Sequence, residues 1–192
     1  MLAALCITGY NLWDDARAGR AASEVLSALQ DKTEDAVSTA AQPLEEDGAY
    51  MVPDYVLNPK MDMPTVEIDG NQYIGTLTVP SRGLSLPVIS EWSYAKLKTA
   101  PCRYSGSAYT NDLVIAGHSY KRHFRPLRNL PEGDTVLFTD AAGNVFTYEV
   151  GTVETLRLTM VEEMTDSDWD LSLFTCTPNS RARIVVRCMR TE

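Results

Sequence analysis

A cysteine and an arginine flank one predicted turn near the end of the chain, in the stretch LFTCTPNSRARIVVR (173–187). Cys176 closes an apolar run, Pro178 stops a strand because it has no N–H to donate, and Arg183 opens the next apolar run. If the two runs pair, the guanidinium returns beside the thiol. A nearby cation favours a thiolate and can donate to a carbonyl oxygen. The spacing therefore predicts attack of a thiolate on a carbonyl; the alternative is an inert thiol followed by a surface arginine.

A thiol nucleophile usually works with a histidine, and the chain contains two. His118 follows the apolar run LVIAG, where a strand gives way to a polar loop, so it occupies a strand end as Cys176 does. His123 lies in the cationic stretch YKRHF and is predicted to be a surface loop residue. His118 is the expected partner of Cys176, with a solvated capping role as the alternative.

Arg187 is a second arginine in the strand that Arg183 begins. It lies four residues inside that strand, so Arg183 is the better candidate for the site. Because side chains alternate along a strand, Arg183 and Arg187 lie on the same face. The alternative interpretation is that both are simply exposed there.

Charge and spacing argue against two other classes of protein. The net charge is −9, whereas proteins that bind nucleic acid need clustered cations. No Cys-x-x-Cys or His-x-x-x-His spacing occurs, so a structural zinc site is not expected.

The elements that must position these residues are mostly strands, and they begin after Gly70. A short helix is expected at 91–100, a loop at 101–111 and one helical turn within 124–134. A hairpin with its loop at Asp140 to Asn144 is expected within 135–150. Many short strands and few helices predict a mainly β barrel or sandwich. The strand-like runs are 73–80, 84–90, 112–118, 135–140, 144–150, 151–158, 170–176 and 183–189.

The first 70 residues differ in character from the rest. Residues 1–13 begin with an apolar run too short to cross a bilayer, and we interpret them as the end of a truncated membrane anchor, with a merely apolar terminus as the alternative. Residues 14–70 are predicted to form a helix, up to about Lys32, and then a Pro-rich linker or strap.

The four cysteines are Cys6, Cys102, Cys176 and Cys188, too few for a disulfide-built scaffold. Cys102 and Cys188 are a possible pair, and two buried thiols are the alternative.

Three quoted stretches together resemble the sortase family, the cysteine transpeptidases of Gram-positive cell surfaces. They are IGTLTVPSRGLSLPV, DLVIAGHS and LFTCTPNSRARIVVR, in this order. The family's FxxLxxLxxGD phrase also recurs, from Phe124 to Asp134. The resemblance covers roughly residues 71–190, and we expect the catalytic domain to be residues 71–192.

The resemblance implies an eight-stranded sortase-type β-barrel with an N-terminal helix and a few short helices. It implies catalysis by His118, Cys176 and Arg183, with Thr175 and Thr177 at the substrate. No metal or organic cofactor is implied.

The implied partners are surface proteins that carry an LPxTG-like sorting signal and an amine acceptor from a peptidoglycan precursor or a pilin. The implied location is the cell membrane, with a single N-terminal anchor and an extracellular catalytic domain. Two alternatives stay open: a cysteine hydrolase on the same scaffold, and a non-catalytic peptide-binding surface module.

The subclass expected from the resemblance is class B-like or class D-like. The extended N-terminal part is similar to class B, whereas the segment TMVEEMTDSDWD (159–170) is shorter than the helical insertion usual there. A pilin-type lid is not expected, because VPDYVLNP (52–59) has its Pro and Asp in reverse order.

Overall fold

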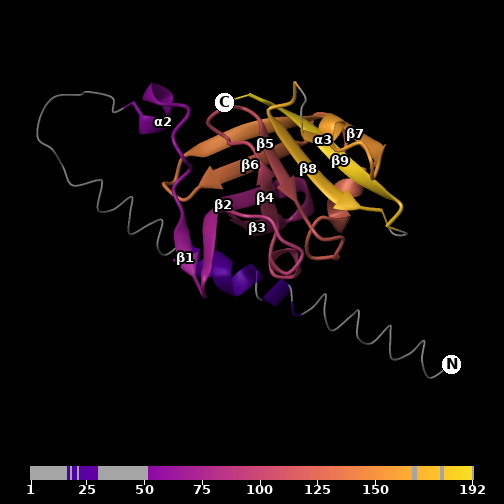
Figure 1. The fold of residues 1–192 in the computed structure, drawn as a ribbon, viewed down its shortest axis with the longest axis horizontal. Coiled ribbons are helices and arrows are strands. Elements are labelled where there is room, and N and C mark those ends of the chain that lie inside the picture. The colour runs from indigo at the N-terminus through magenta and orange to yellow at the C-terminus, as the bar shows by residue number, and fades with distance from the viewer. Residues whose placement is uncertain are drawn as a thin grey trace, which may run out of the picture.

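The protein is a closed β-barrel with a few short helices around it (Figure 1). The computed structural model describes residues 17, 19–20, 22–29, 52–165, 168–177 and 180–191. The predicted anchor end, residues 1–13, and residues 33–51 of the predicted strap lie outside these residues. No helix within the described part is both long and apolar enough to span a bilayer.

Nine strands form one sheet in the described part of the chain. They are β1 (Val66–Ile68), β2 (Asn71–Val79), β3 (Leu84–Ile89), β4 (Cys102–Ser105), β5 (Leu113–Ala116), β6 (Thr135–Asp140), β7 (Val145–Arg157), β8 (Leu171–Cys176) and β9 (Ala182–Arg190). The short helices include α2 (Asp54–Leu57), η1 (Pro80–Arg82), η2 (Lys96–Lys98), η3 (Arg125–Asn129) and α3 (Glu162–Thr165).

Eight of these strands close the barrel, which confirms the predicted fold class. The order is β2-β3-β4-β5-β8-β9-β7-β6, and β6 pairs with β2 again to complete the ring. At this seam Gly75 has φ +150°, and a Cβ there would lie 2.0 Å from the Thr139 carbonyl oxygen. Only glycine allows the two strands to approach so closely.

Alternation of apolar and polar residues decides which side chains fill the barrel. In β6 the buried residues are Val136, Phe138 and Asp140, and the residues between them are exposed or half-buried. The interior cluster includes Leu77, Phe138 and Phe146, all fully buried. A continuous apolar core therefore holds the strand ends in fixed places.

The predicted number of barrel strands is right, but two of the predicted strands are wrong. Residues 144–150 and 151–158 form one long strand, β7, with a register shift between Val150 and Thr152. Conversely, the predicted loop 101–111 contains β4. Gly151 suggests a break, whereas in the fold it marks a bulge inside a continuous strand.

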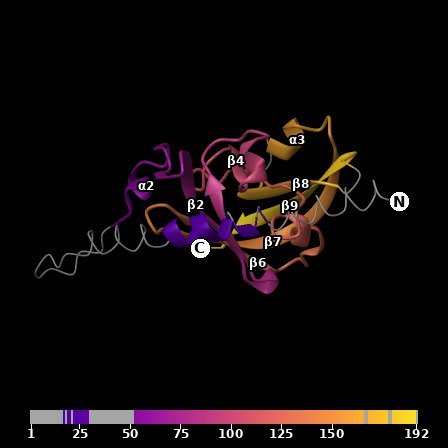
Figure 2. The same ribbon diagram turned by 90° about the horizontal axis from the view of Figure 1, so that it is seen from below.

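The N-terminal helical residues pack on the outside of the barrel (Figure 2). Residues 17, 19–20 and 22–29 are helical, within the predicted helix. Val25 and Leu29 pack against Tyr73, Ile89 and Cys102. The segment thus covers the outer face of β2, β3 and β4.

Helix α2 lies at the end of the barrel that holds the start of β7. Tyr55 of this helix stacks on Tyr109 with ring centroids 4.7 Å apart and contacts Phe146 at 5.3 Å. Phe146 is near the start of β7, whereas Leu156, near its end, pairs with Arg183. The segment around α2 is therefore docked at the end opposite Cys176, as expected if it is not a lid.

Candidate active site

The register of two parallel strands aligns His118 with Cys176. Strand β5 pairs with β8 so that Ala116 faces Phe174, and the Gly117 amide donates to the Phe174 carbonyl at 2.9 Å. His118 lies two residues beyond Ala116, and Cys176 lies two residues beyond Phe174. The two residues therefore stand at the same level at the ends of neighbouring strands.

The next strand pair aligns Cys176 with Arg183. Strands β8 and β9 are antiparallel, and Cys176 is directly opposite Arg183. Side chains in such positions share one face of the sheet, with Cβ atoms about 4.5–5.5 Å apart. Cys176 is exposed and Arg183 half-buried, so the thiol and guanidinium share one accessible rim.

The Arg183 guanidinium is held by contacts on either side. It lies over the Phe174 ring, 5.5 Å from the centroid, and donates to the Leu158 carbonyl at 3.1 Å. Phe174 is two residues before Cys176 on the same face of β8. The cation is thus tethered to the connection that follows β7 and kept at the thiol's end of the strand.

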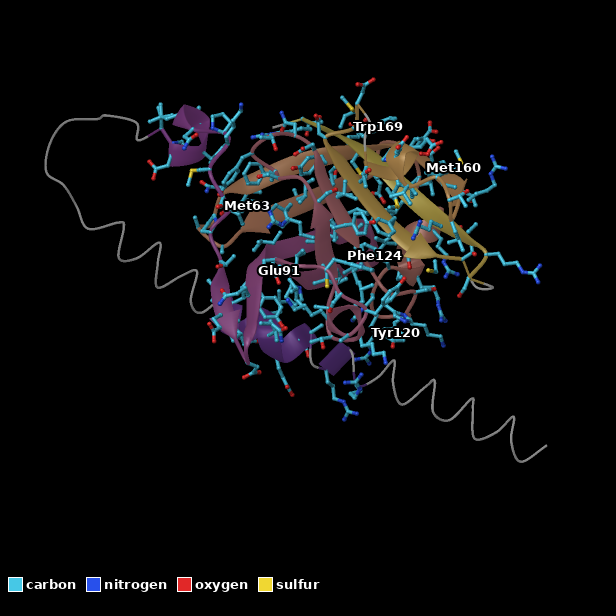
Figure 3. All side chains as sticks on the ribbon, viewed as in Figure 1. Met63, Glu91, Tyr120, Phe124, Met160 and Trp169 are labelled. Carbon is cyan, nitrogen blue, oxygen red and sulfur yellow. The ribbon has the colours of Figure 1, made fainter. Side chains whose placement is uncertain are left out.

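The turn that follows His118 is folded by the Gly117–Phe124 pair. Phe124 is fully buried, and a Cβ on Gly117 would lie 2.3 Å from its ring. The Phe124 amide donates to the His118 carbonyl at 3.1 Å, which closes the loop. Tyr120 then stacks on the His118 imidazole, with centroids 3.8 Å apart and planes at 16°; Figure 3 labels Tyr120 and Phe124.

Thr175 and Thr177, predicted at the substrate, lie in different surroundings. Thr175 is only 3% exposed and alternates with Cys176, so its side chain is on the opposite face of β8. Thr177 is half-buried, and its hydroxyl bridges the Ala182 amide and carbonyl, both at 3.1 Å. Thr177 therefore closes the hairpin that brings Arg183 to Cys176.

Two of the sequence-based interpretations are wrong about exposure. His123 is fully buried rather than on the surface, because the loop folds back and places Tyr120 edge-on to it at 5.4 Å. Arg187 is 2% exposed rather than solvated. A cationic stretch therefore indicates solvent exposure only when neither its own loop nor a distant segment covers it.

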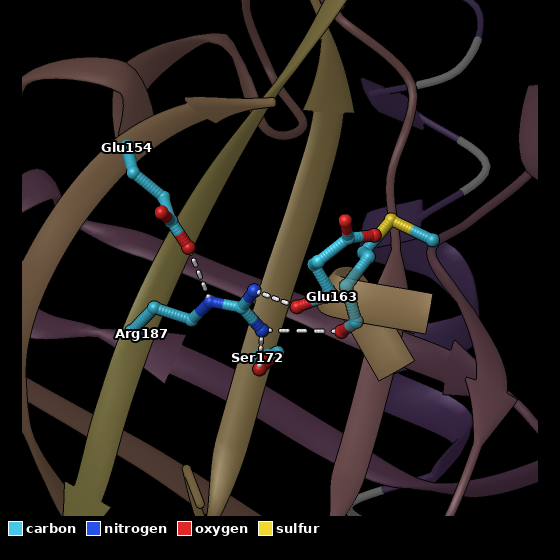
Figure 4. Close-up of polar contacts among 5 residues, drawn as sticks. Glu154, Glu163, Ser172 and Arg187 are labelled. Atoms are coloured by element: carbon cyan, nitrogen blue, oxygen red, sulfur yellow. Dashed lines mark hydrogen bonds and ion pairs between the residues drawn. The ribbon is translucent and has the colours of Figure 1, made fainter. Parts of the chain in front are cut away.

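Arg187 is buried because four groups surround its guanidinium (Figure 4). It pairs with Glu154 at 2.8 Å, donates to the Ser172 hydroxyl at 2.8 Å, and donates to the carbonyls of Glu163 and Met164 in α3. This arginine fastens α3 to the sheet. Arg187 therefore has a structural role, and of the two arginines in β9 considered for the site, Arg183 is the one that lies beside Cys176.

Sequence reasoning missed Arg128, which touches the backbone of the candidate nucleophile. Its Nη2 donates to the Cys176 carbonyl at 3.0 Å and also to the Ser119 hydroxyl. The predicted helical turn at 124–134 is η3, and it carries Arg128 back to the strand ends. The sequence did contain one signal for Arg128: it is an arginine in the predicted helical turn that follows the strand of His118.

A row of aromatic rings begins beside the rim. Phe174 meets Tyr104 edge-on at 5.3 Å, and Tyr104 meets Trp92 at 5.6 Å. Trp92 in turn contacts the exposed Tyr94 at 4.9 Å. An open hollow lies along this row, lined by Ser90, Glu91, Trp92, Arg103, Tyr104, Ser105 and Gly106.

The two cysteines considered as a disulfide pair are both free and buried. Burial raises the pKa of the Cys102 thiol to about 11 and that of Cys188 to about 12. Both are therefore neutral thiols at physiological pH. Within the described residues no three His, Cys, Asp or Glu side chains gather as they would around a metal ion.

The chain belongs to the sortase family: the family model for the sortase domain matches residues 77–191, more than half of the sequence. This match includes His118, Cys176 and Arg183. No curated protein matches the chain significantly.

Solved structures with the same fold include sortases of three kinds. Sortase A from Corynebacterium diphtheriae is 21% identical, with a TM-score of 0.57 over 98% of this chain and 95% of that one. A Clostridium perfringens sortase D5 transpeptidase is 19% identical, with a TM-score of 0.56 over 66% and 83%. Clostridium perfringens sortase C, solved with the C-terminal cell wall sorting motif, is 20% identical, with a TM-score of 0.56 over 88% and 89%.

Proposed function

We propose that this sortase is a membrane-anchored cysteine transpeptidase that cleaves an LPxTG-like sorting signal and joins the acyl fragment to a cell-wall or pilin amine. One observation carries the proposal: the registers β5–β8 and β8–β9 bring His118, Cys176 and Arg183 to one exposed rim. The family and the sortase C structure with a sorting motif support this class of substrate.

In the first half-reaction the Cys176 thiolate attacks the carbonyl carbon of the peptide bond that joins the last two residues of the motif. The carbonyl π electrons move to oxygen, and Arg183 donates hydrogen bonds to the oxyanion that forms. When the C–N bond breaks, His118 as imidazolium protonates the leaving amine, a contribution of about 10²–10⁴-fold. The products are a thioester on Cys176 and the released C-terminal peptide.

In the second half-reaction an incoming amine attacks the thioester carbonyl. His118, now neutral, accepts the proton from that amine, and the sulfur leaves as the Cys176 thiolate. The new amide bond carries the acyl fragment, and the enzyme returns to its starting protonation state. Neither step uses a metal or an organic cofactor.

The aromatic row beside Phe174 supports a peptide substrate with apolar side chains. Tyr104 and Trp92 extend the surface away from Cys176, and aromatic faces bind aliphatic and proline side chains well. The Arg183 side chain over Phe174 lies where this surface meets the thiol.

The test is incubation of the protein with an LPxTG-like peptide, with and without glycine or diaminopimelate as the amine. We expect a ligated product that depends on the amine and disappears in Cys176→Ala, whereas Cys102→Ala retains activity. Cleavage without ligation at high amine concentration would instead indicate a cysteine hydrolase. No cleavage by a folded protein, with any sorting peptide, would favour a peptide-binding module.

A further inference from the structure

Arg128 is the residue at the rim for which the proposed mechanism has no role. It lies in η3, is half-buried, and is separated from Cys176 by 48 positions in the sequence. Its Nη2 atom contacts two groups at once, the Cys176 carbonyl and the Ser119 hydroxyl. A single guanidinium nitrogen therefore joins the end of β8 to the residue that follows His118.

The contact with the Cys176 carbonyl completes the restraint of one peptide plane. The amide of this same peptide belongs to Thr177 and donates to the Ala182 carbonyl at 2.9 Å. In a trans peptide the carbonyl and the amide point in opposite directions. The Cys176–Thr177 peptide is therefore held from both sides, by η3 at its oxygen and by β9 at its nitrogen.

The charge of Arg128 acts on the same place. Burial lowers the pKa of the Arg128 guanidinium, the nearby Arg125 lowers it further, and Cys176 acts in the opposite direction. An arginine remains a cation at physiological pH in spite of such shifts. The Arg128 guanidinium therefore brings a positive charge close enough to Cys176 for the two groups to interact electrostatically.

We propose that Arg128 is a positioning residue for Cys176, which fixes the peptide after the nucleophile, ties it to the loop of His118, and supplies a second positive charge beside the thiol. This inference rests on the proposed function in taking Cys176 as the nucleophile. Arg183 faces the reacting carbonyl from β9, whereas Arg128 acts from the backbone side through η3.

The test is alkylation of Cys176 by iodoacetamide across a pH series, followed by mass spectrometry of the Cys176 peptide. This measurement needs no sorting peptide, so it reports on Arg128 even if the proposed transpeptidation is wrong. In Arg128→Gln we expect the pH of half-maximal alkylation to rise by about one unit. At neutral pH the alkylation rate should then fall about tenfold.

Arg125→Gln is the matched control. Arg125 is exposed, also belongs to η3, and holds the same loop through a bond from its Nε to the Ser119 carbonyl at 3.1 Å. This hydrogen bond goes to Ser119 and not to Cys176, so we expect the wild-type pH profile for alkylation. An equal rise in Arg125→Gln would mean that any nearby charge suffices, and would overturn the assignment to Arg128.

Arg128→Lys keeps the charge and serves if the glutamine variant does not fold. An ammonium is a point charge without the guanidinium's planar fork. We expect its pH of half-maximal alkylation to lie within about 0.3 units of wild type. Hydrogen exchange at the Thr177 amide should be faster, because the Cys176–Thr177 peptide is held less firmly. A profile shared by wild type and Arg128→Gln, or an upward shift of about one unit in Arg128→Lys, would overturn the proposal.

Discussion

The two ends of the barrel are built by the same strands and differ in how their polar groups are treated. At the end near the start of β7, the Asp140 carboxylate is 1% exposed and accepts four hydrogen bonds. The donors are the Tyr109 hydroxyl, the Ala142 amide, and the amide and side chain of Asn144. At the other end Cys176 is exposed, and Arg183 lies half-buried beside it.

The difference separates stability from reactivity. A buried carboxylate with a full set of donors fixes the loops around it and has no capacity left for a ligand. An exposed thiol with Arg183 and Arg128 nearby contributes little to packing and is accessible to a substrate. We therefore expect changes at the Asp140 end to alter unfolding, and changes at the Cys176 end to alter chemistry.

The largest contrast should appear in thiol reactivity between the two ends. Cys188 pairs with Leu171 at the start of β8, is fully buried, and has its pKa raised to about 12, whereas Cys176 ends the same strand in solvent. At about pH 8 we expect Cys176 to react with iodoacetamide at least ~10²-fold faster than Cys188. Peptide mass spectrometry of time points measures both rates, and equal rates would remove the contrast.

The next largest effect should be a loss of activity in Arg183→Lys, at the end of the barrel that carries Cys176. Lysine keeps the charge and loses the fork of donors, so we expect kcat/KM for a sorting peptide to fall about 10²–10³-fold. The melting temperature should stay within about 2 °C of wild type. Arg181→Lys, in an exposed residue of the same hairpin, is the control. Near-full turnover in Arg183→Lys would show that charge alone is enough.

At the end of the barrel that carries Asp140, Tyr109→Phe removes one hydrogen-bond donor from the buried carboxylate. Because a buried carboxylate is then left with an incomplete set, we expect the free energy of unfolding to fall by about 1–3 kcal/mol. Turnover at 25 °C should remain at the wild-type level. Urea unfolding and peptide ligation measure the two, with Tyr94→Phe, at an exposed tyrosine, as the control. Lost turnover with unchanged stability would mean that the two ends are coupled.

The smallest effect should be a decline in stability at alkaline pH. The pKa of the Cys188 thiol is raised from 9.0 to about 12, so the folded protein binds this proton more tightly than the unfolded chain does. The contribution of this protonated thiol to the free energy of unfolding is complete below about pH 9 and is lost as the pH rises toward 12. Cys188→Ala should flatten the decline between about pH 9 and pH 10.5 in urea unfolding. A wild-type stability that is constant over this range would contradict the assignment.

Much of the barrel follows from patterns within short stretches. Apolar runs ending in polar loops gave His118 and Cys176 as strand ends, and the spacing to Arg183 predicted the hairpin that β8 and β9 form. The prediction failed at β4, where CRYS lacks a strong apolar pattern and is a strand because β5 pairs with it. Glycine misled at Gly151, since a bulge and a strand end have the same local signal.

The candidate site was predictable only in part, because its supporting contacts come from distant segments. Arg128 and Arg187 look alike as surface cations in the sequence. One touches Cys176 across 48 positions, and the other is buried by α3 and Glu154. His123 is buried in a different way, by the fold of its own loop, which places Tyr120 edge-on to it.

The sequence by itself determined which residues end strands and therefore which side chains stand at a rim, because period-two alternation and Pro or Gly breaks act locally. The tertiary structure decided which ends meet, since the β5–β8 pairing joins residues about 60 positions apart in register. It also decided which charges are solvated. Burial of a cation depends on partners that only the closed barrel brings within hydrogen-bonding distance.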